Sequence, residues 1–313
     1  MEEIAMIELD ETQKKILAEV ADLHKIPVGA FNIRSNGESV GRNSTANIEI
    51  TPKTDVSGID IRIKPGTKNE SVHIPVIISK TGHSEAVYND FYIGEGADVL
   101  IVAGCGIDNC GNVDSKHDGI HRFHIGKGAH IKYVEKHYGS GTGEGKRIMN
   151  PVTEVFMEED SSCEMEMVQI KGVDDTTRVT NATLAAGCKL LVGERLMTHD
   201  DQRAISKYNV DLNGAGSSAD VVSRAVARDR SYQEFEAVIS GNAPCHGHSE
   251  CDSIIMDEGI ILAVPALKAN CVDAELIHEA AIGKIAGEQI VKLMTLGLTE
   301  QEAEEEIING FMK

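Results

Sequence analysis

Several kinds of residue are scarce in this chain of 313 residues, and each scarcity argues against a class of protein. There is no tryptophan, and aromatic residues make up only 4% of the sequence. A carbohydrate-active enzyme on a β-solenoid needs aromatic platforms and paired carboxylates, and this chain has few aromatics from which to build such a site. No apolar run approaches the roughly 20 residues that a membrane-spanning helix requires. Aliphatic side chains must therefore fill the core in thin layers.

Positive charge is also scarce. Thirty Lys and Arg residues stand against 50 Asp and Glu residues, which gives a net charge of −20. Such a surface repels phosphate backbones and anionic lipid, so neither nucleic acid nor a membrane is an expected partner. The N-terminal residues Met1, Glu2 and Glu3 are followed by no signal-peptide core, which predicts a cytoplasmic protein.

The seven cysteines contain no CxxC pair. Their odd number argues against a framework of disulfides, and the missing pairs argue against a closed zinc site with four thiolates. The thiols are therefore candidates for packing or for a more open metal site.

The middle of the chain, residues 28–270, has the alternation of β-strands. Apolar residues recur with period two at 48–50, 59–63 and 72–74. A weak repeat accompanies this pattern: the segment 93–99 recurs as 125–131, and looser echoes follow at spacings of about 26–33 residues. Such spacing is typical of one turn of a parallel β-solenoid. A β-sandwich with glycine turns is the alternative.

Helical patterns are found at both ends of the chain. Residues 10–24 are predicted to form a helix with Asp10 as its cap, Gln13 three residues later, and Pro27 beyond its end. Its apolar stripe consists of Ile16, Val20 and Leu23.

Near the C-terminus, the spacing of Ile282, Ala286, Ile290 and Leu293 predicts another helix, which ends at Gly297. Thr299 and Glu302 form a capping box for a last helix, whose stripe consists of Ala303, Ile307 and Phe311. This hairpin is predicted to dock a partner, and it could also cap a solenoid. Three segments result: an N-terminal helical segment (1–27), a β-helix core (28–270) and a C-terminal helical segment (271–313).

A dense group of possible ligands lies just before this last segment. Residues 245–251 contain Cys245, His246, His248, Glu250 and Cys251. Thiolates favour soft metals and iron–sulfur clusters, whereas imidazole and carboxylate bind iron without closing the site. A cluster held by few thiols would be bound weakly enough to be given away. A polar turn explains the same residues equally well.

At this point the sequence resembles a known family. The resemblance lies in Cys251-Asp-Ser-Ile-Ile, Val264-Pro265, Ala274-Glu-Leu-Ile-His278-Glu279-Ala280, Gly283-Lys284-Ile285 with Glu288-Gln289, and the stretch from Gly297 to Phe311. These residues resemble the C-terminal signature of the SufB/SufD family, the scaffolds of Suf iron–sulfur cluster assembly. The resemblance is dense over 245–313, looser over 85–245 and poor over the first 80 residues. The chain resembles a short, minimal SufB-like form.

The resemblance implies a mainly β protein, a right-handed parallel β-helix with a short N-terminal helix and a C-terminal helical hairpin. It implies a transient iron–sulfur cluster, [4Fe–4S] or [2Fe–2S], bound by Cys251, His278 and Glu279. Because His278 matches a ligand of the SufD-like partner, a homodimer is expected to do the work of the heterodimer. In typical SufB the residue before this histidine is often acidic, and here it is Ile277.

Partners are implied in the same way. A SufC-like ABC ATPase is expected to bind the C-terminal helices, and sulfur donors and acceptor apo-proteins are expected to visit the scaffold. The expected ATPase-docking residues are Ile282, Lys284, Ile285, Glu288, Gln289 and Leu293. This chain is expected to bind no nucleotide itself, since the glycine-rich stretch 139–147 lacks the spacing of a phosphate loop.

Other cysteines have weaker claims. Cys105 matches a Gly-Cys turn that receives sulfur in SufB, so it could accept a persulfide and relay sulfur toward Cys251, although the residues after it depart from the family's pattern. A buried structural thiol is the alternative. Cys245 and Cys271 are secondary candidates, and Cys163 and Cys188 are expected in the core. His117, His121 and His124 are interpreted as part of a polar turn.

Three functions remain open at this stage. The first is a non-catalytic assembly scaffold, with ATP hydrolysed by the partner. The second is a carbohydrate-active β-solenoid enzyme. The third is a mononuclear metalloenzyme that uses Cys251, His278 and Glu279 and works without a partner.

Overall fold

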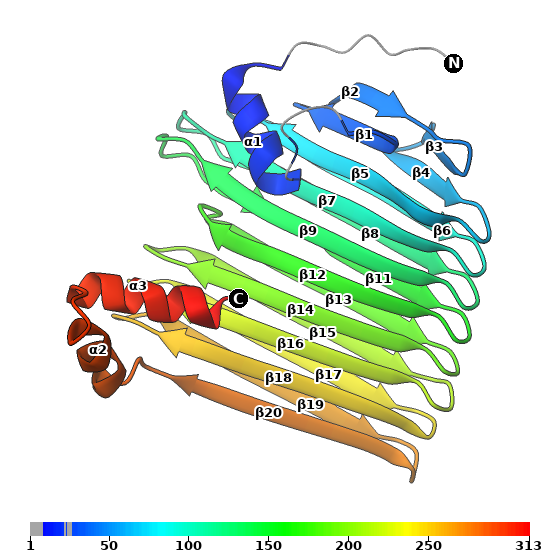
Figure 1. The fold of residues 1–313 in the computed structure, drawn as a ribbon. Helices are drawn as coiled ribbons and strands as arrows, with labels where there is room; N and C mark the ends of the chain where they lie inside the picture. Colours follow the sequence, from blue (N-terminus) through cyan, green and yellow to red (C-terminus); the bar gives the residue numbers. More distant parts are fainter. Residues whose placement is uncertain (1–8, 22, 24–26) are drawn as a thin grey trace.

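The structure is a β-solenoid. The computed structural model describes residues 9–21, 23 and 27–313. It is mostly strand and winds through about eight turns, with one helix near the N-terminus and two at the C-terminus (Figure 1). The prediction of a solenoid is therefore confirmed, and the β-sandwich alternative is wrong.

Each turn contributes one strand to each of two long sheets. Sheet A contains, in spatial order, β2 (Glu38–Asn43), β1 (Ala30–Ser35), β5 (Lys68–Ile78), β7 (Asp98–Asp108), β9 (His130–Ser140), β12 (Ser162–Lys171), β14 (Lys189–Thr198), β16 (Ser218–Ala227), β18 (Cys245–Ile255) and β20 (Ala274–Gly283). Sheet B contains β19 (Ile260–Ala269), β17 (Tyr232–Gly241), β15 (Arg203–Leu212), β13 (Asp175–Leu184), β10 (Arg147–Met149), β8 (Ser115–Ile125), β6 (Ser84–Ile93), β4 (Gly58–Ile63) and β3 (Ile48–Pro52), with β11 (Val152–Met157) also between β13 and β8.

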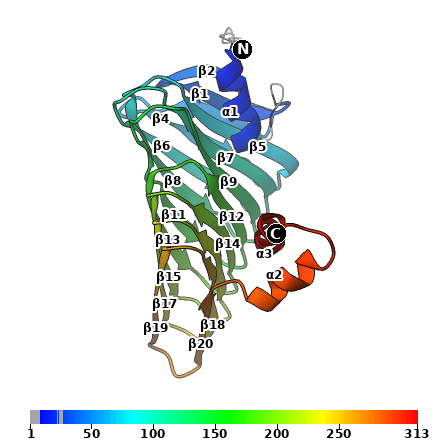
Figure 2. The ribbon, with the colours of Figure 1, turned by 90° about the vertical axis from the view of Figure 1, so that its left-hand side faces the viewer.

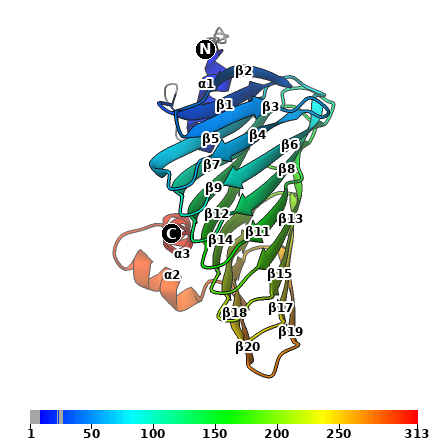
Figure 3. The same cartoon turned by 90° about the vertical axis from the view of Figure 1, so that its right-hand side faces the viewer.

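The two sheets face each other across a narrow interior (Figure 2 and Figure 3). Strand residues alternate between buried and partly exposed positions, so every second side chain points inward. One continuous core of mostly aliphatic residues results, in which Phe91 stacks on Phe123 with ring centroids 4.5 Å apart. This alternation explains why the period of two was visible in the sequence.

The repeat detected in the sequence corresponds to one turn of the solenoid. Val99 on β7 pairs with Ile131 on β9, so the segments 93–99 and 125–131 are stacked on each other. Gly96 and Gly128 have φ angles of 64° and 62°, which glycine adopts without strain. The N–H of Gly96 donates to Lys127 O at 2.9 Å, and this bond links one corner to the next.

Helix α1 (Glu11–Ala21) covers the outer face of sheet A near its N-terminal end. The predicted cap is confirmed, because the N–H of Gln13 donates to Asp10 Oδ1 at 2.8 Å. Ile16 and Val20 are buried against β5, β7 and β9. The predicted helix ran from 10 to 24; residues 22 and 24 lie outside the described residues.

The C-terminal helices are α2 (Gly287–Met294) and α3 (Glu300–Phe311). The capping box of Thr299 and Glu302 is present. Both helices lie along the outer face of sheet A instead of across the end of the solenoid (Figure 2). No helix in the described part of the chain is long and apolar enough to cross a membrane.

One boundary differs from the prediction. The segment 271–313 was expected to be helical, but β20 extends the solenoid to Gly283 and the first helix begins at Gly287. The reason is that Ile282 belongs to the alternating pattern of β20, where it is in register with Ser253. Its spacing to Ala286 therefore mimicked a helical stripe.

Candidate functional site

Cys251 lies on β18 and points into the solenoid. Its side chain is fully buried and belongs to the main hydrophobic core. Burial raises the pKa of the Cys251 thiol, and the hydroxyl of Ser253, 3.5 Å from the sulfur, partly offsets this rise. The thiol is therefore protonated in this state and needs a cation or an opening of the last turn to become a ligand.

His278 lies on the neighbouring strand β20 and shares this inner face. Its Nδ1 atom lies 2.7 Å from Ser249 Oγ, and Ser249 is the residue with which it is in register. Cys251 is in register with Ala280, two residues further along β20. The two candidate ligands are thus diagonal neighbours, a position from which long side chains reach each other.

Glu279 points the other way. Since successive strand residues face opposite sides, its carboxylate lies on the outer face of sheet A, opposite His278. There it is grouped with His248 and Glu250, whose ligand atoms lie within 4.8 Å of one another and of Glu279. The structure therefore brings Cys251 and His278 together and places Glu279 on the other side of the same two strands.

The last turn of the solenoid is open. Strands β19 and β20 are the final strands of their sheets, and each is paired on one side only. On β19 the side chains of Ile260, Leu262 and Val264 are 56%, 45% and 42% exposed. A long apolar edge of this kind is a surface prone to association.

The secondary cysteines lie elsewhere. Cys245 begins β18, six residues before Cys251, which places it roughly 20 Å away along the strand. Cys271 lies in the turn before β20, where its N–H donates to Gly241 O at 3.1 Å. Neither thiol joins Cys251. Cys163 and Cys188 are buried in the core, as predicted.

Cys105 is also an interior residue. It lies on β7 and is 2% exposed, so the thiol is not open to a donor protein in this state. Burial and the charges of Glu85 and Glu135 raise its pKa well above the usual value. A cavity of about 10 Å³ lies beside it, room for a single water at most. The structure is compatible with the buried structural thiol of the alternative interpretation.

A polar cluster in the middle of the interior was not predicted from the sequence. Glu135 forms a buried ion pair with Arg178, and Tyr133 donates its hydroxyl to Glu135 at 3.0 Å. Burial lowers the pKa of His121 and of His137 to about 4, so both rings are neutral. Burial alone would raise the pKa of Glu135, but the charge and hydrogen bond of the Arg178 guanidinium lower it below its ordinary range.

The cluster continues toward Cys251 through Glu194. Its carboxylate accepts hydrogen bonds from Ser206 at 2.5 Å, Tyr208 at 2.9 Å and Ser223 at 2.8 Å. Ser223 is in register with Cys251 on the next strand. Polar groups therefore line the inner face of sheet A between Cys105 and Cys251, which lie about 24 Å apart across five strand spacings.

The interpretation of three histidines needs correction. His117, His121 and His124 were assigned to a polar turn, but all three lie within strand β8. His117 and His121 are buried, and only His124 points outward. Alternation at 117, 119, 121 and 123 was the available signal, and the polarity of the inward residues concealed it.

The residues expected to dock an ATPase lie on two elements. Ile282 lies on β20, Glu288, Gln289 and Leu293 lie on α2, and Lys284 and Ile285 lie between these elements. Ile282, Lys284, Glu288 and Gln289 are exposed, while Ile285 and Leu293 are half-buried. Val291, Met294 and Leu296 add exposed apolar surface beside them, which was not predicted from the sequence.

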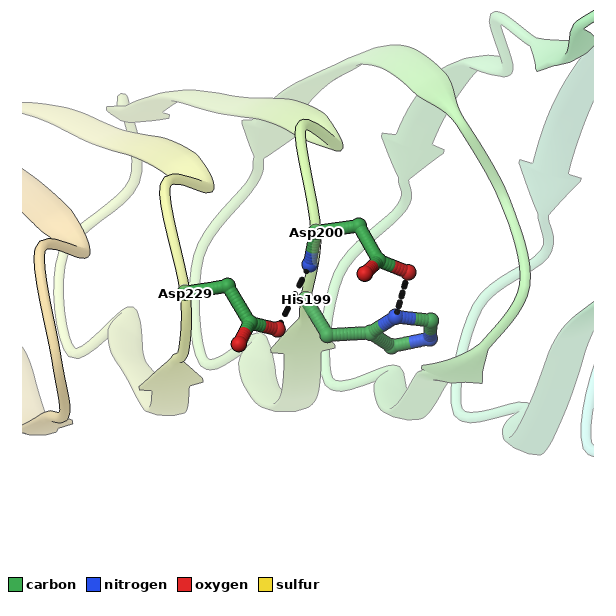
Figure 4. Close-up of side chains that lie close together, drawn as sticks. All are labelled: His199, Asp200 and Asp229. Carbon is green, nitrogen blue, oxygen red and sulfur yellow. Dashed lines mark hydrogen bonds and ion pairs between the residues drawn. The ribbon is translucent and has the colours of Figure 1, made fainter.

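A second group of possible ligands lies at a corner of the solenoid. His199 Nδ1 lies 2.8 Å from Asp200 Oδ2, and the N–H of Asp200 donates to Asp229 Oδ2 at 2.8 Å (Figure 4). The N–H of Asp229 donates in turn to Asp257 at 3.2 Å. All three aspartates have φ angles between 51° and 54°. They form a ladder of turn residues, which accounts for the group without a metal.

A surface pocket of about 580 Å³ lies on sheet B, away from Cys251. Tyr92, His124 and Phe156 stack along it at centroid distances of 5.1 and 5.2 Å. Glu158 is the one acidic residue in its lining, as far as the described residues show. The pair of carboxylates that glycoside hydrolysis requires is therefore missing there.

Comparison with known proteins gives the family. The family described as "SUF system FeS cluster assembly, SufBD core domain" matches residues 78–311. A protein of Archaeoglobus fulgidus named "Iron-sulfur cluster assembly SufBD family protein" is 30% identical over 263 residues, which cover 83% of this chain and 69% of that protein. A Pyrococcus horikoshii protein of the same family is 26% identical over 294 residues, 90% of this chain and 86% of its own.

A relative from Methanothermobacter thermautotrophicus is 28% identical over 263 residues, 82% of this chain but only 63% of its own length. This chain thus spans less than two thirds of that relative. The family match begins at residue 78, near the point where the resemblance in the sequence becomes clear. From this match and these relatives we conclude that the chain belongs to the SufBD family of iron–sulfur cluster assembly proteins.

Proposed function

We propose that this chain is a non-catalytic scaffold on which iron–sulfur clusters are assembled and from which they are transferred. The observation that supports this most directly is the position of Cys251 and His278. They share the inner face of the last two strands of sheet A, at the open end of the solenoid. One thiol and one imidazole are too few to hold a cluster firmly, which suits a cargo that must leave.

The scaffold works as a homodimer. Pairing the open last turns of two copies would cover the apolar side chains of β19 and bring two Cys251–His278 pairs together. Glu279 lies on the adjoining outer face, where a rearranged last turn can turn it toward the same cluster. The cluster is [4Fe–4S] or [2Fe–2S], and acceptor apo-proteins receive it.

Energy comes from a SufC-like ABC ATPase that binds the C-terminal helices. The exposed residues Glu288, Gln289 and Val291 of α2 offer a docking surface. Because α2 follows β20 after three residues, a pull on the helix acts directly on the strand that carries His278. A chain that ends at Ile282 should lose ATPase binding while the solenoid stays folded.

Sulfur reaches the site from a donor protein. Cys105 is the candidate acceptor: its thiolate would attack the outer sulfur of a donor persulfide, so that the donor leaves as a thiolate and Cys105 carries the persulfide. Its burial means that the surrounding strands must open first. The polar groups between Cys105 and Cys251 would then accompany sulfur through the interior.

The mononuclear metalloenzyme is the weaker hypothesis. It requires Cys251, His278 and Glu279 to reach one ion, but Glu279 lies on the opposite face of its strand from His278. The carbohydrate-active enzyme has no suitable pair of carboxylates in the surface pocket on sheet B.

Anaerobic reconstitution with iron and sulfide tests the proposal. Wild type is compared with Cys251→Ala and His278→Ala, and with Cys110→Ser, which removes an exposed thiol remote from the site. The readouts are the visible absorption of the cluster and the acid-labile sulfide per dimer. We expect a cluster in wild type and Cys110→Ser, and its loss in the other two variants. A wild-type protein that binds metal without labile sulfide would overturn the proposal.

A further inference from the structure

The outer face of the last two strands of sheet A carries a group of ligands that is separate from the thiol on the inner face. We propose that His248, Glu250 and Glu279 form a binding site for a single divalent metal ion, with Fe²⁺ as the ion used. One imidazole and two carboxylates are donors suited to Fe²⁺. The role of this site as the source of iron rests on the proposed function, but its existence as a metal site does not.

The geometry supports the site directly. The ligand atoms of the three residues lie within 4.8 Å of one another. Two donors bonded to one ion at about 2.0–2.2 Å lie at most about 4.4 Å apart, so only a small movement of these side chains is needed to bring all three onto one ion. Three protein donors leave positions open for water or sulfide, so the ion can be bound and later given up.

A fourth residue orients the histidine. His248 donates from Nδ1 to Asp220 Oδ1 on strand β16 at 2.8 Å, and Asp220 is its register partner. This bond fixes the tautomer in which Nε2 carries the free lone pair. A carboxylate behind a histidine in this way is the usual support of a metal-binding imidazole. Asp220 is not one of the three proposed ligands, so its hydrogen bond to His248 is an independent indication that His248 binds a metal.

The strand register supplies a second indication. Glu250 and Glu279 are directly opposite each other on β18 and β20. Like charges in this arrangement destabilise a sheet unless a cation lies between them. Asp252, two residues along β18 on the same face, adds to the negative charge. No residue of the described chain forms a salt bridge with Glu250 or Glu279, so a cation from solution would relieve the repulsion.

The corner group of His199, Asp200 and Asp229 offers a matched comparison. It has the same types of donor, but its Asp229 carboxylate already accepts a hydrogen bond from the N–H of Asp200 in the neighbouring turn, and its Asp200 carboxylate already pairs with His199 (Figure 4). In the outer-face group, no neighbouring turn within the described residues donates a hydrogen bond to the carboxylate of Glu250 or Glu279. The hydrogen bonds of the turns explain why the corner residues lie together, but they do not explain the outer-face group.

Titration with Co²⁺ alone, without sulfide, tests the site. Wild type is compared with Glu250→Gln, with Asp229→Asn as the corner control, and with Cys251→Ala. We expect one Co²⁺ per chain in wild type, at least 10-fold weaker binding in Glu250→Gln, and unchanged binding in the two others. The absorption should show the weak bands of nitrogen and oxygen ligands, without the intense near-ultraviolet band of a thiolate. Because Fe²⁺ binds such donors more weakly than Co²⁺, only a molar excess of Fe²⁺, added anaerobically, should displace the Co²⁺.

Thermal unfolding distinguishes a metal-binding role of Glu250 from a merely structural one. Without metal, Glu250→Gln should unfold at the same temperature as wild type or higher, because one of two opposed charges is gone. With metal, only wild type and the two other variants should gain stability. Wild type without a Co²⁺ site, undiminished binding in Glu250→Gln, equal loss in Asp229→Asn, or loss in Cys251→Ala would each overturn the proposal.

The outcomes for the metal site and for the scaffold are distinguishable. If Co²⁺ binds as expected but no variant assembles a labile-sulfide cluster, the site stands and the scaffold function fails. If a cluster assembles normally in Glu250→Gln while Co²⁺ never binds, the scaffold stands and the site fails.

Discussion

The two ends of the solenoid close in different ways. At the N-terminal end, the antiparallel pairs β1–β2 and β3–β4 cover the first parallel strands, and Ile48 and Ile59 are almost completely buried. At the C-terminal end, β19 and β20 have no further strand beside them, and Leu262 is 45% exposed. Solenoids need a cap at each end to stay soluble and separate. Within the described residues, only the N-terminal end of this solenoid has its own cap.

The candidate ligands lie at the end that has no cap. The interior of the middle turns holds charged groups that are fully paired, such as Glu194, whereas His278 on the last turn is half-exposed. Rigid, satisfied polar groups suit a framework, and exposed ligands suit a site that exchanges its cargo. The difference therefore separates a stable middle from an open end that carries the candidate ligands.

The largest effect is expected from Glu194→Ala in the middle turns. Its removal leaves three hydroxyls without their acceptor and Arg178 without its second carboxylate, at 3.8 Å, and breaking a buried pair costs about 3–5 kcal/mol. Urea unfolding measures this cost. His278→Ala on the open turn should cost about 1 kcal/mol or less, because its ring is partly solvated already. Equal costs at the two positions would contradict the comparison.

The next largest effect is expected from acid, which should lower the stability of the middle turns. The buried ring of His121 has a pKa of about 4, whereas an unfolded histidine takes up its proton near 6.5. The unfolded state therefore binds more protons between these values, so stability is fully present above pH 6.5 and falls as the pH decreases toward 4. His121 alone contributes on the order of 3 kcal/mol to this fall. Urea midpoints at several pH values measure it, and a flat profile would contradict the burial of the ring.

A charge on the open edge should weaken self-association. Leu262→Lys places a lysine on β19, and a lysine at a strand edge opposes pairing with another chain. We expect dimer dissociation to increase roughly 30-fold, the effect of losing a strong interface contact. Sedimentation measures it.

The control for this edge is Leu191→Lys on the outer face of β14, where the leucine is 50% exposed. This variant should stay dimeric. Dissociation of both variants, or of neither, would place the interface elsewhere than on the last turn.

The sequence predicted much of this fold because its signals are local. The repeat of Ile93–Val99 and Ile125–Ile131 shows the turn of the solenoid, and Thr299 with Glu302 marks the start of α3. The position of Cys251 and His278 on one face also follows from alternation once the strands are known. Strand β20 was missed, however, because the four-residue spacing from Ile282 to Ala286 is typical of a helix. An even spacing also fits the alternation of a strand, so this pattern did not distinguish the two.

Other features depend on contacts that local patterns do not encode. The pairing of Glu135 with Arg178 joins residues 43 apart and on different sheets. The opposition of Glu250 and Glu279 depends on the register of β18 and β20. A polar residue at an inward position resembles a turn residue until its partner is known, which is why the histidines of β8 were misassigned.

The smallest expected effect concerns the end that is capped. Helix α1 approaches sheet A so closely that a Cβ added at Gly106 would lie 2.1 Å from Ile16 Cγ2. The helix must shift to admit a methyl group, so Gly106→Ala should cost about 1 kcal/mol. Gly193 on β14 has open space at the same outer face, its nearest neighbour being 4.0 Å away, so Gly193→Ala should be neutral or slightly stabilising. Hydrogen exchange of the α1 amides should increase only in Gly106→Ala, because the packing of α1 on sheet A depends on that close approach. Unchanged exchange in Gly106→Ala would show that α1 is held by something other than its contact with β7.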